Sequence, residues 1–288
     1  MTAKRTTIKS CRFNLSKGFT TLTAQTDAAE NSFSPEDWAR CLADPMQLLA
    51  SCDMTFRPDR VIVKTLDIAD TQKKVVVKCH STENSLRGFF RSLRSVKAFR
   101  NFAVAVSLLE HNIPVAFPLA ALQRRGFLRT TEFYITEYYD NCGNIHDFIR
   151  QHLRNLGPQL PPFKRQAASQ LAAIMASLDK AHFWHRDAKA TNFILLKPQN
   201  HQYRIMLVDM DGIKRYFIRR TASRIRSLAR LAASVIAVPG INSTDFLRMF
   251  LIYCDLTGIK KSRRSRIFRK IAKLALKKWK KLASQNRY

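Results

Sequence analysis

The chain has 288 residues, which is enough for a sizeable core and for two lobes. Its apolar content of 46% excludes a disordered chain and suits a globular protein. Fifty Lys and Arg against 21 Asp and Glu give a net charge of +29, which attracts polyanions such as nucleic acid, anionic lipid headgroups, phosphorylated glycans and nucleotides.

The chain begins with a polar segment, residues 1–33, that is rich in Thr, Ser and Ala and predicts little structure. Its basic start lacks the apolar stretch of a secretory signal, and no later stretch approaches the roughly 18 apolar residues of a membrane span. The six Cys form no C-x-x-C pair, so we expect reduced thiols in a cytosolic protein and no zinc site.

Residues 34–137 predict a β-rich lobe with a leading helix. Ser34 can cap that helix, and Pro35 suits its first turn. Two β-branched runs, residues 61–63 and 75–77, flank a polar segment and predict a hairpin. The spacing of apolar residues further predicts a helix over 92–111, strands over 117–120 and 132–136, and a turn at 124–126.

Residues 138–258 predict a helical lobe, and residues 259–288 a basic helix. A β-rich segment before a helical one predicts an α+β, bilobal fold, with a small β-rich N-lobe and a larger helical C-lobe. The predicted elements of the C-lobe are helices over 145–156, 163–182 and 219–233, a break at 158–162, and strands over 193–196 and 204–208.

The eight residues His185–Asn192 have the layout of a kinase catalytic loop, with an Asp and an Asn five residues apart and a Lys between them. A long predicted helix precedes them, and an apolar strand ends in Asp209, 22 residues after Asp187. Phosphoryl transfer needs an oriented nucleophile, metal ions and a cation on the phosphates. We therefore predict two catalytic residues, Asp187 to orient the acceptor hydroxyl and Lys189 to reach the γ-phosphate. Together with the two lobes, the loop predicts a bilobal protein-kinase-like fold, in which the hinge residues Glu137 and Tyr139 are expected to contact the nucleotide.

The same motif predicts oxygen donors for Mg²⁺. Asn192 and Asp209 offer amide and carboxylate oxygens, which this hard cation prefers, and would hold it against the phosphates of ATP. Asp211 is a further candidate ligand, and the alternative is a turn residue before Gly212.

Lys78 ends a valine run and is expected to bind the α- and β-phosphates, as the strand lysine of kinases does. Lys64 also follows a β-branched run and is the alternative candidate for this role. Two kinase parts are missing. Residues 51–60 contain no glycine that could form a G-x-G-x-x-G loop, and the helix over 92–111 has no acid except at its far end. Asn101 occupies the position where the acid that pairs with the lysine is expected.

Several segments together match one known family. They are Val77-Lys78, Arg94–Asn101, Ile113-Pro114, Phe117–Leu119, Ile135–Tyr138, His185–Asn192, Val208–Asp211, Leu228–Leu231 and Phe246–Arg248. From about Trp38 to Tyr253 the chain resembles the lipopolysaccharide kinase family (Kdo/WaaP type). The resemblance implies an ATP- and Mg²⁺-dependent kinase of a Kdo or heptose hydroxyl in the lipopolysaccharide inner core, at the cytoplasmic face of the inner membrane. It also implies Asp187 as base, Asn192 and Asp209 as metal ligands and Lys78 on the phosphates.

Two other functions fit part of the sequence. A Ser/Thr protein kinase shares the catalytic loop, but here the chain passes from Asp209 towards a basic helix without a long activation loop or an A-P-E element. A membrane-associated kinase-like scaffold without activity would explain the missing glycine loop and helix Glu. Such a scaffold has no need of Asp187, Asn192 and Asp209 together.

The tail, residues 259–288, contains no acid and predicts a basic amphipathic helix. A basic helix with an interfacial Trp is typical of a membrane-surface helix, so residues 260–282 are expected to bind an anionic membrane. The alternative, compatible with the first, is that its apolar face packs on the helical lobe. Nucleic acid ranks third as a partner, because no nucleic-acid-binding motif accompanies the charge.

Overall fold

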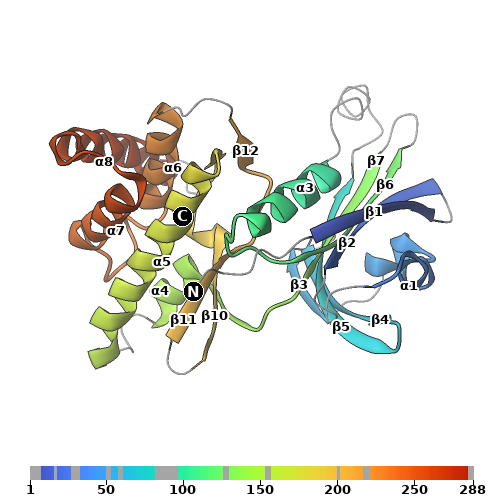
Figure 1. The fold of residues 1–288 in the computed structure, drawn as a ribbon. Coiled ribbons are helices and arrows are strands. Elements are labelled where there is room, and N and C mark those ends of the chain that lie inside the picture. The colour runs from blue at the N-terminus through green and yellow to red at the C-terminus, as the bar shows by residue number, and fades with distance from the viewer. Residues whose placement is uncertain are drawn as a thin grey trace. The chain divides into compact units, whose positions relative to one another are not determined.

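The chain divides into two compact units, residues 1–139 and residues 140–288. The first unit contains a large sheet and the second is mainly helical (Figure 1). This confirms the predicted α+β class with a β-rich N-terminal part and a helical C-terminal part. The computed structural model describes residues 8–15, 18–26, 33–49, 53–57, 61–81, 97–125, 130–152, 157–199, 202–216 and 221–284.

The N-terminal unit is built on an antiparallel sheet, whose described strands follow the order β1-β2-β6-β7-β5-β4-β3 (Figure 1). Its core buries large side chains from the strands and helices, among them Phe19, Trp38, Phe102 and Phe133. The strands are β1 (Ile8–Leu15), β2 (Phe19–Thr26), β3 (Met54–Arg57), β4 (Val61–Ile68), β5 (Thr71–Ser81), β6 (Pro118–Arg125) and β7 (Thr130–Glu137). The predicted hairpin of residues 61–63 and 75–77 is confirmed as β4–β5.

The prediction that residues 1–33 have little structure is wrong for β1 and β2. These strands form a hairpin, and β2 pairs with β6 at the edge of the sheet. Leu15, Phe19 and Ala24 are buried, and the ring centroid of Phe19 lies 6.0 Å from that of Phe133. Thr-rich strands with few apolar residues give a weak local signal, because their stability comes from packing against a sheet that is distant in sequence.

The described residues of this unit also form two α-helices and a 3₁₀ helix. α1 (Pro35–Cys41) begins with a capping box, in which Ser34 Oγ accepts a hydrogen bond from Asp37 N at 3.1 Å. A 3₁₀ helix, η3 (Pro45–Leu49), follows. α3 (Lys97–Glu110) confirms the helix expected over 92–111, of which residues 92–96 lie outside the described residues.

The C-terminal unit combines helices with short strands that carry the predicted catalytic loop. Its helices are α4 (Ile145–His152), α5 (Leu160–Lys180), α6 (Thr221–Ala233), α7 (Ser243–Thr257) and α8 (Lys261–Ala283). Its strands are β8 (Asn141–Asn144), β9 (Phe183–His185), β10 (Phe193–Gln199), β11 (Gln202–Leu207) and β12 (Ile213–Arg215). The break expected over 158–162 is wrong from residue 160 on. Pro161 and Pro162 lie in the first turn of α5, where backbone N–H groups have no partner within the helix.

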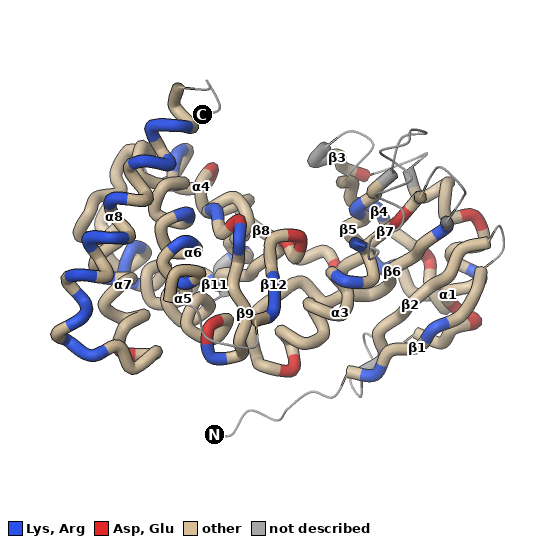
Figure 2. Tube along the Cα trace, turned by 90° about the horizontal axis from the view of Figure 1, so that it is seen from above, with Lys and Arg blue, Asp and Glu red and all other residues tan. Residues whose placement is uncertain are grey.

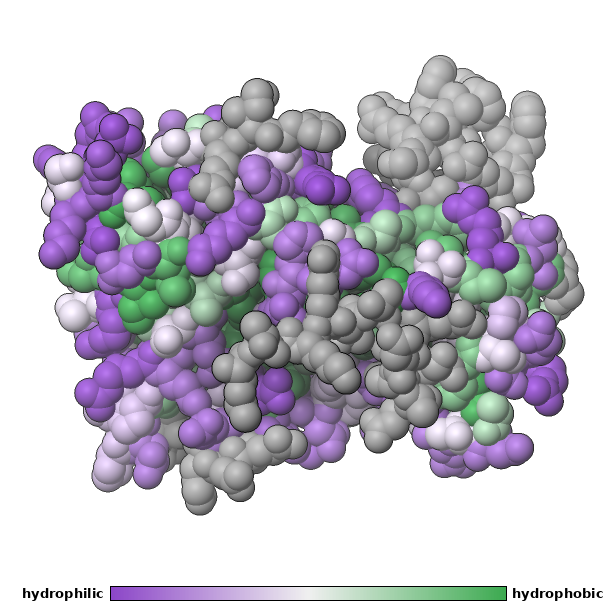
Figure 3. All heavy atoms as spheres, viewed as in Figure 1, coloured by the Kyte–Doolittle hydropathy of each residue, from purple (hydrophilic) through white to green (hydrophobic). Residues whose placement is uncertain are grey.

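The C-terminal helix α8 packs on α6 and α7. Ile271 and Ala275 are buried in this contact, and the ring centroid of Phe268 lies 5.3 Å from that of Phe250 on α7. Lys and Arg follow α8 along its length (Figure 2). Hydrophilic and hydrophobic atoms are interspersed over these helices, at the left of Figure 3. The packing alternative for the tail is therefore correct. Among the described helices, none has the length and apolarity to cross a membrane.

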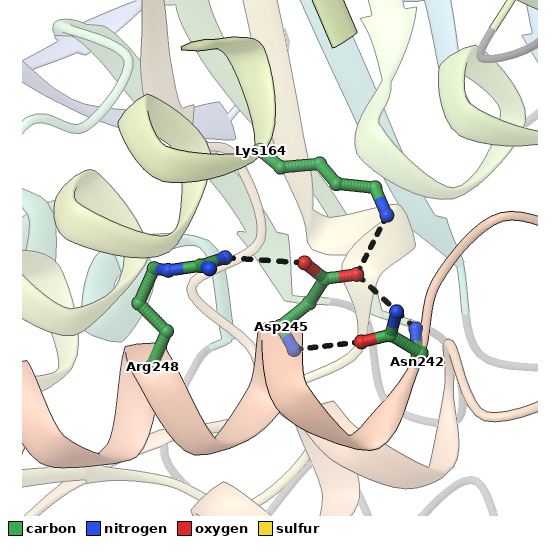
Figure 4. A network of polar contacts seen from close by, with 4 residues as sticks. All are labelled: Lys164, Asn242, Asp245 and Arg248. Carbon is green, nitrogen blue, oxygen red and sulfur yellow. Dashed lines mark hydrogen bonds and ion pairs between the residues drawn. The ribbon is translucent and has the colours of Figure 1, made fainter. Parts of the chain in front are cut away.

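An ion-pair network joins α5 to the start of α7 (Figure 4). Asn242 caps α7 by accepting a hydrogen bond from Asp245 N at 3.0 Å. The carboxylate of Asp245 accepts hydrogen bonds from Lys164 of α5 at 2.8 Å and from Arg248 at 3.2 Å. The network thus gives a hydrogen-bond acceptor to a backbone N–H in the first turn of α7, and it connects two helices that are far apart in the sequence.

A second polar cluster surrounds Asp179, whose side chain is only 6% exposed near the end of α5. Its carboxylate forms an ion pair with Arg224 of α6 at 2.5 Å and accepts a hydrogen bond from the Tyr216 hydroxyl at 2.6 Å. Arg224 also donates to the Tyr253 hydroxyl of α7 at 3.1 Å. Burial raises the pKa of Tyr253 to about 12, which keeps this hydroxyl neutral. The cluster therefore connects α5, α6 and α7 beside the strand that leads to the catalytic loop.

We expect Asp179→Ala to lower the free energy of unfolding by about 3–5 kcal/mol, because the half-buried guanidinium of Arg224 loses its carboxylate. Urea unfolding followed by circular dichroism measures this loss. The matched control is Asp255→Ala, which removes the ion pair of a 67% exposed carboxylate with Arg264 and should cost less than about 1 kcal/mol. Equal losses for the two variants would contradict the assignment.

Candidate active site

The start of the catalytic loop is held by a two-stranded pairing. β9 pairs with β12, so that His185 lies opposite Ile213. Arg186 N then donates a hydrogen bond to Gly212 O at 2.7 Å. Inside the loop, Lys189 N donates to Asp187 O at 2.8 Å. These backbone bonds fix the conformation of the loop at Asp187, and the loop ends in a short 3₁₀ turn, η5 (Ala190–Asn192).

A second pairing brings Asn192 next to Asp209. β10 pairs with β11 in a register that puts Phe193 opposite Leu207, and Val208 N donates to Asn192 O at 3.0 Å. Asn192 and Val208 are therefore neighbours across the hairpin, and Asp209 follows directly. The Asn192 side-chain amide also donates to Asp187 O at 2.8 Å. The C-terminal unit thus brings Asp187, Asn192 and Asp209 together.

The oxygen donors of this group fit a hard cation. The Asn192 side-chain nitrogen is engaged with the loop, so the amide oxygen is the atom that can face a metal ion. Asp209 and Asp211 are half-buried, and Asp211 N donates to Asp209 Oδ1 at 3.2 Å. Within the described residues, no three His, Cys, Asp or Glu side chains gather to hold a metal ion. Magnesium commonly binds through one or two carboxylates together with substrate phosphates, which suits these donors. The ligand roles of Asn192, Asp209 and Asp211 stay predictions.

Two cations contact the carboxylate of Asp187. Its Oδ1 forms a close ion pair with Nε of Arg230 on α6, and its Oδ2 lies 3.3 Å from Nζ of Lys189. The Asp187 side chain is 34% exposed, so a substrate hydroxyl can reach it. Sequence patterns did not single out Arg230. It lies in a helix far along the chain, where spacing says nothing of which side chain faces the loop.

His185 lies fully buried at the base of the loop. Burial lowers its pKa to about 4, although the nearby carboxylates of Asp209 and Asp187 act in the opposite direction. A Cβ atom at Gly212 would come within 2.7 Å of the imidazole Nδ1, so the close approach of these two loops requires glycine. His185 therefore supports the loop as a neutral ring.

In the N-terminal unit, Lys78 and Lys64 lie on opposite faces of the sheet. Lys64 is opposite Val75 in the β4–β5 register, and the Val75 side chain is in the core. Lys78 is three residues from Val75 and therefore on the other face. Lys64 donates a hydrogen bond to Gln47 O at 3.2 Å. Lys64 thus has a structural contact, and the phosphate-binding role of Lys78 stays a prediction.

Glu132 is an acid on the same face as Lys78 that sequence patterns did not reveal. Lys78 lies opposite Tyr134 of β7, and Glu132 is two residues from Tyr134. Glu132 is buried and accepts a hydrogen bond from Ala98 N, at the start of α3, at 2.8 Å. This carboxylate therefore holds α3 to the Lys78 face. Asn101, at the expected position of the helix acid, is buried.

The two hinge residues contact each other. The Tyr139 hydroxyl donates a hydrogen bond to Glu137 Oε2 at 2.7 Å, and Lys73 forms a close ion pair with Glu137 Oε1. Burial raises the pKa of Tyr139, and the bond to the Glu137 carboxylate raises it further. Both side chains are thus engaged within the N-terminal unit, and their contact with a nucleotide stays a prediction.

Comparison with known proteins identifies the family. The profile of the lipopolysaccharide kinase (Kdo/WaaP) family matches residues 69–253, well over half of the chain. The chain belongs to this family. The matched range contains every site residue predicted from the sequence. Membership makes this protein a phosphotransferase that acts on a hydroxyl group of the lipopolysaccharide core, with ATP as the phosphate donor.

Solved structures confirm the protein-kinase-like fold. The structure described as "WaaP in complex with acyl carrier protein" is 18% identical, with a TM-score of 0.56 over 84% of this chain and 98% of that chain. A glucosamine kinase is 11% identical, with a TM-score of 0.51 over 98% of this chain and 90% of that chain. At these identities the resemblance concerns the fold. A search among curated proteins found no match.

We expect the stability of the protein to fall between pH 6.5 and pH 4. His185 has a lower pKa in the folded than in the unfolded state, so its contribution is complete above about pH 6.5 and is lost as the pH falls towards 4. As the pH falls, His185 is protonated in the unfolded chain before it is protonated in the folded one. This difference lowers the free energy of unfolding by up to about 3 kcal/mol. Urea unfolding at several pH values measures the slope. His185→Phe keeps an apolar ring and should flatten it, whereas an unchanged slope in that variant would contradict the assignment.

Proposed function

We propose that this kinase transfers the γ-phosphate of ATP, with Mg²⁺, to a hydroxyl of Kdo or heptose in the inner core of lipopolysaccharide. One observation carries the proposal. In a member of this family, the paired strands of the C-terminal unit bring Asp187, Asn192 and Asp209 together, with Lys189 on the Asp187 carboxylate.

The two oxygens of Asp187 suit it to orient a hydroxyl. Arg230 holds Oδ1, while Oδ2 faces Lys189 at 3.3 Å. In the proposed step, Asp187 Oδ2 accepts the proton of the sugar hydroxyl while the oxygen of that hydroxyl forms a bond to the γ-phosphorus of ATP. The bond from that phosphorus to the β–γ bridging oxygen breaks, and ADP leaves. Lys189 neutralises negative charge on the transferring group.

Asn192 and Asp209 would hold Mg²⁺, which would neutralise the phosphates of ATP. The amide oxygen of Asn192 is suited to this role because the nitrogen of the same amide is bonded to Asp187 O. Asp211 would add a third oxygen donor next to Asp209. On the N-terminal unit, Lys78 would bind the α- and β-phosphates in the manner of the kinase strand lysine.

The short connection between β12 and α6 favours a glycan acceptor over a peptide. β12 ends at Arg215 and α6 begins at Thr221, which leaves five residues between them. Protein kinases place a long activation loop and an A-P-E element in this part of the chain, where the peptide binds. Five residues are too few to form a peptide-binding activation loop, and a compact sugar acceptor does not need one.

We expect Asp187→Asn to lower kcat for phosphate transfer by roughly 10²- to 10⁴-fold, because the amide cannot take the hydroxyl proton. Labelled ATP and purified inner-core glycolipid measure the transfer. Asp140→Asn, at a side chain that is 70% exposed, is the control and should keep full activity. Unchanged phosphate transfer in Asp187→Asn would contradict the mechanism. Label on peptides instead of glycolipid would favour a protein kinase.

We further propose that the protein binds the cytoplasmic face of the inner membrane through α7 and α8. On α8, the side chains of Lys270, Lys273 and Lys277 are exposed on one side of the helix. Large apolar side chains are exposed on the same two helices, namely Leu247, Leu251, Leu256, Leu274 and Leu276. A surface that combines exposed lysines with exposed leucines suits an anionic bilayer.

Removing Lys270, Lys273 and Lys277 together, each to Ala, should weaken binding to anionic vesicles by about 10²-fold, at roughly 1 kcal/mol for each lysine. Co-sedimentation with phosphatidylglycerol-containing vesicles measures the change, and phosphatidylcholine vesicles give the background. The matched control removes three exposed lysines elsewhere, Lys9, Lys97 and Lys180. An equal loss in the control would point to net charge alone and contradict a surface on α8.

A further inference from the structure

One lysine of α8 differs from its neighbours. Lys270, Lys273 and Lys277 are exposed, whereas Lys278 is half-buried. It follows Ile271 by seven residues and Ala275 by three, so it lies on the side of the helix that these two buried residues define. This side packs on α6. Lys278 therefore faces the protein rather than a membrane.

The helix that α8 packs on also carries Arg230, which pairs with Asp187. Burial lowers the pKa of Lys278, and the charge of Arg230 lowers it further, while Asp187 acts in the opposite direction and Lys189 adds to the lowering. These are interactions between neighbouring charges. The ammonium group of Lys278 thus belongs to the group of charges around the catalytic carboxylate.

The charges in this group do not balance. Lys189, Arg230 and Lys278 are three cations around the carboxylate of Asp187. The nearby carboxylates of Asp209 and Asp211 are assigned to Mg²⁺ in the proposed function, so the group around Asp187 has two positive charges in excess. Both Asp187 oxygens already have a cation, and among the described residues no carboxylate forms an ion pair with Lys278. Partly buried charge without a counter-ion costs free energy, which an anionic ligand would recover.

The geometry separates this excess charge from the transferring phosphate. Lys189 faces Asp187 Oδ2, the side assigned to the γ-phosphate, whereas Arg230 binds Oδ1. A guanidinium has five N–H donors in a planar fork, so Arg230 can keep Asp187 on Nε and offer its terminal nitrogens to an oxyanion. Lys278 lies outside the range 69–253 that matches the family, so the family match assigns it no role.

This inference rests on the proposed function. We propose that Lys278 and Arg230 form a subsite for an anionic group of the acceptor, a carboxylate or a phosphate close to the hydroxyl that is phosphorylated. Lys278 is then a specificity-determining residue. It selects an acidic or already phosphorylated sugar over a neutral one and places its hydroxyl beside Asp187.

The test compares acceptors with and without anionic groups. Deacylated, water-soluble core oligosaccharide removes any effect of membrane binding. It is used intact, with its carboxylates reduced to alcohols, or with its phosphates removed. For the wild type, the acceptor that lacks the recognised anion should have a KM roughly 10- to 100-fold higher, since hydrogen bonds to charged groups are strong. The two treated acceptors tell a carboxylate from a phosphate.

Lys278→Ala should raise the KM for the intact acceptor by the same factor and remove the discrimination, with the KM for ATP unchanged. Lys278→Arg should restore the discrimination. Lys180→Ala removes the same charge from an exposed position of the C-terminal unit and should behave as the wild type. Thermal melting confirms that each variant is folded.

Two failures are distinguishable. If the wild type phosphorylates core oligosaccharide but Lys278→Ala still discriminates, or if Lys180→Ala loses as much discrimination, the subsite is wrong and the proposed function stands. If the wild type transfers no phosphate to any of the three acceptors, the proposed function fails, and with it the acceptor role of Lys278. A raised KM for ATP in Lys278→Ala would overturn the inference by assigning the residue to the nucleotide.

Discussion

Two antiparallel pairings in the C-terminal unit position Asp187, Asn192 and Asp209. β9 with β12 holds the backbone that leads into Asp187, and β10 with β11 puts Asn192 next to Asp209. Backbone hydrogen bonds set both registers, so the carboxylates and the amide are placed before any ligand is bound. Such preorganisation is what phosphoryl transfer requires of a protein, because the reaction depends on positioning and charge rather than on covalent chemistry.

The surplus of positive charge is distributed in two ways with different consequences. On the exposed side of α8 it gives a field suited to an anionic surface. On the buried side of the same helix, Lys278 adds its positive charge to the cations around Asp187, and this charge acts at short range. In our two proposals the faces of this one amphipathic helix have separate roles, one towards a membrane and the other towards the catalytic loop.

The N-terminal unit departs from the common kinase pattern. No glycine precedes β4 in the segment where a phosphate-covering loop is expected, and α3 has Asn101 where an acid is expected. In their place, the sheet gains the edge hairpin β1–β2, and Glu132 from a strand holds the start of α3. Attaching the helix through a strand acid keeps it on the Lys78 face without the usual helix residue.

Sequence alone determined the features whose signals are local. The catalytic loop is one contiguous octapeptide, Asp209 ends a recognisable strand, and the helices show their own periodicity. Tertiary structure decided the rest. It added β1 and β2 to the sheet, packed α8 on α6, and brought Arg230, to which the sequence assigned no role, to the Asp187 carboxylate. These outcomes depend on contacts between residues dozens of positions apart, which packing selects and which spacing along the chain does not encode.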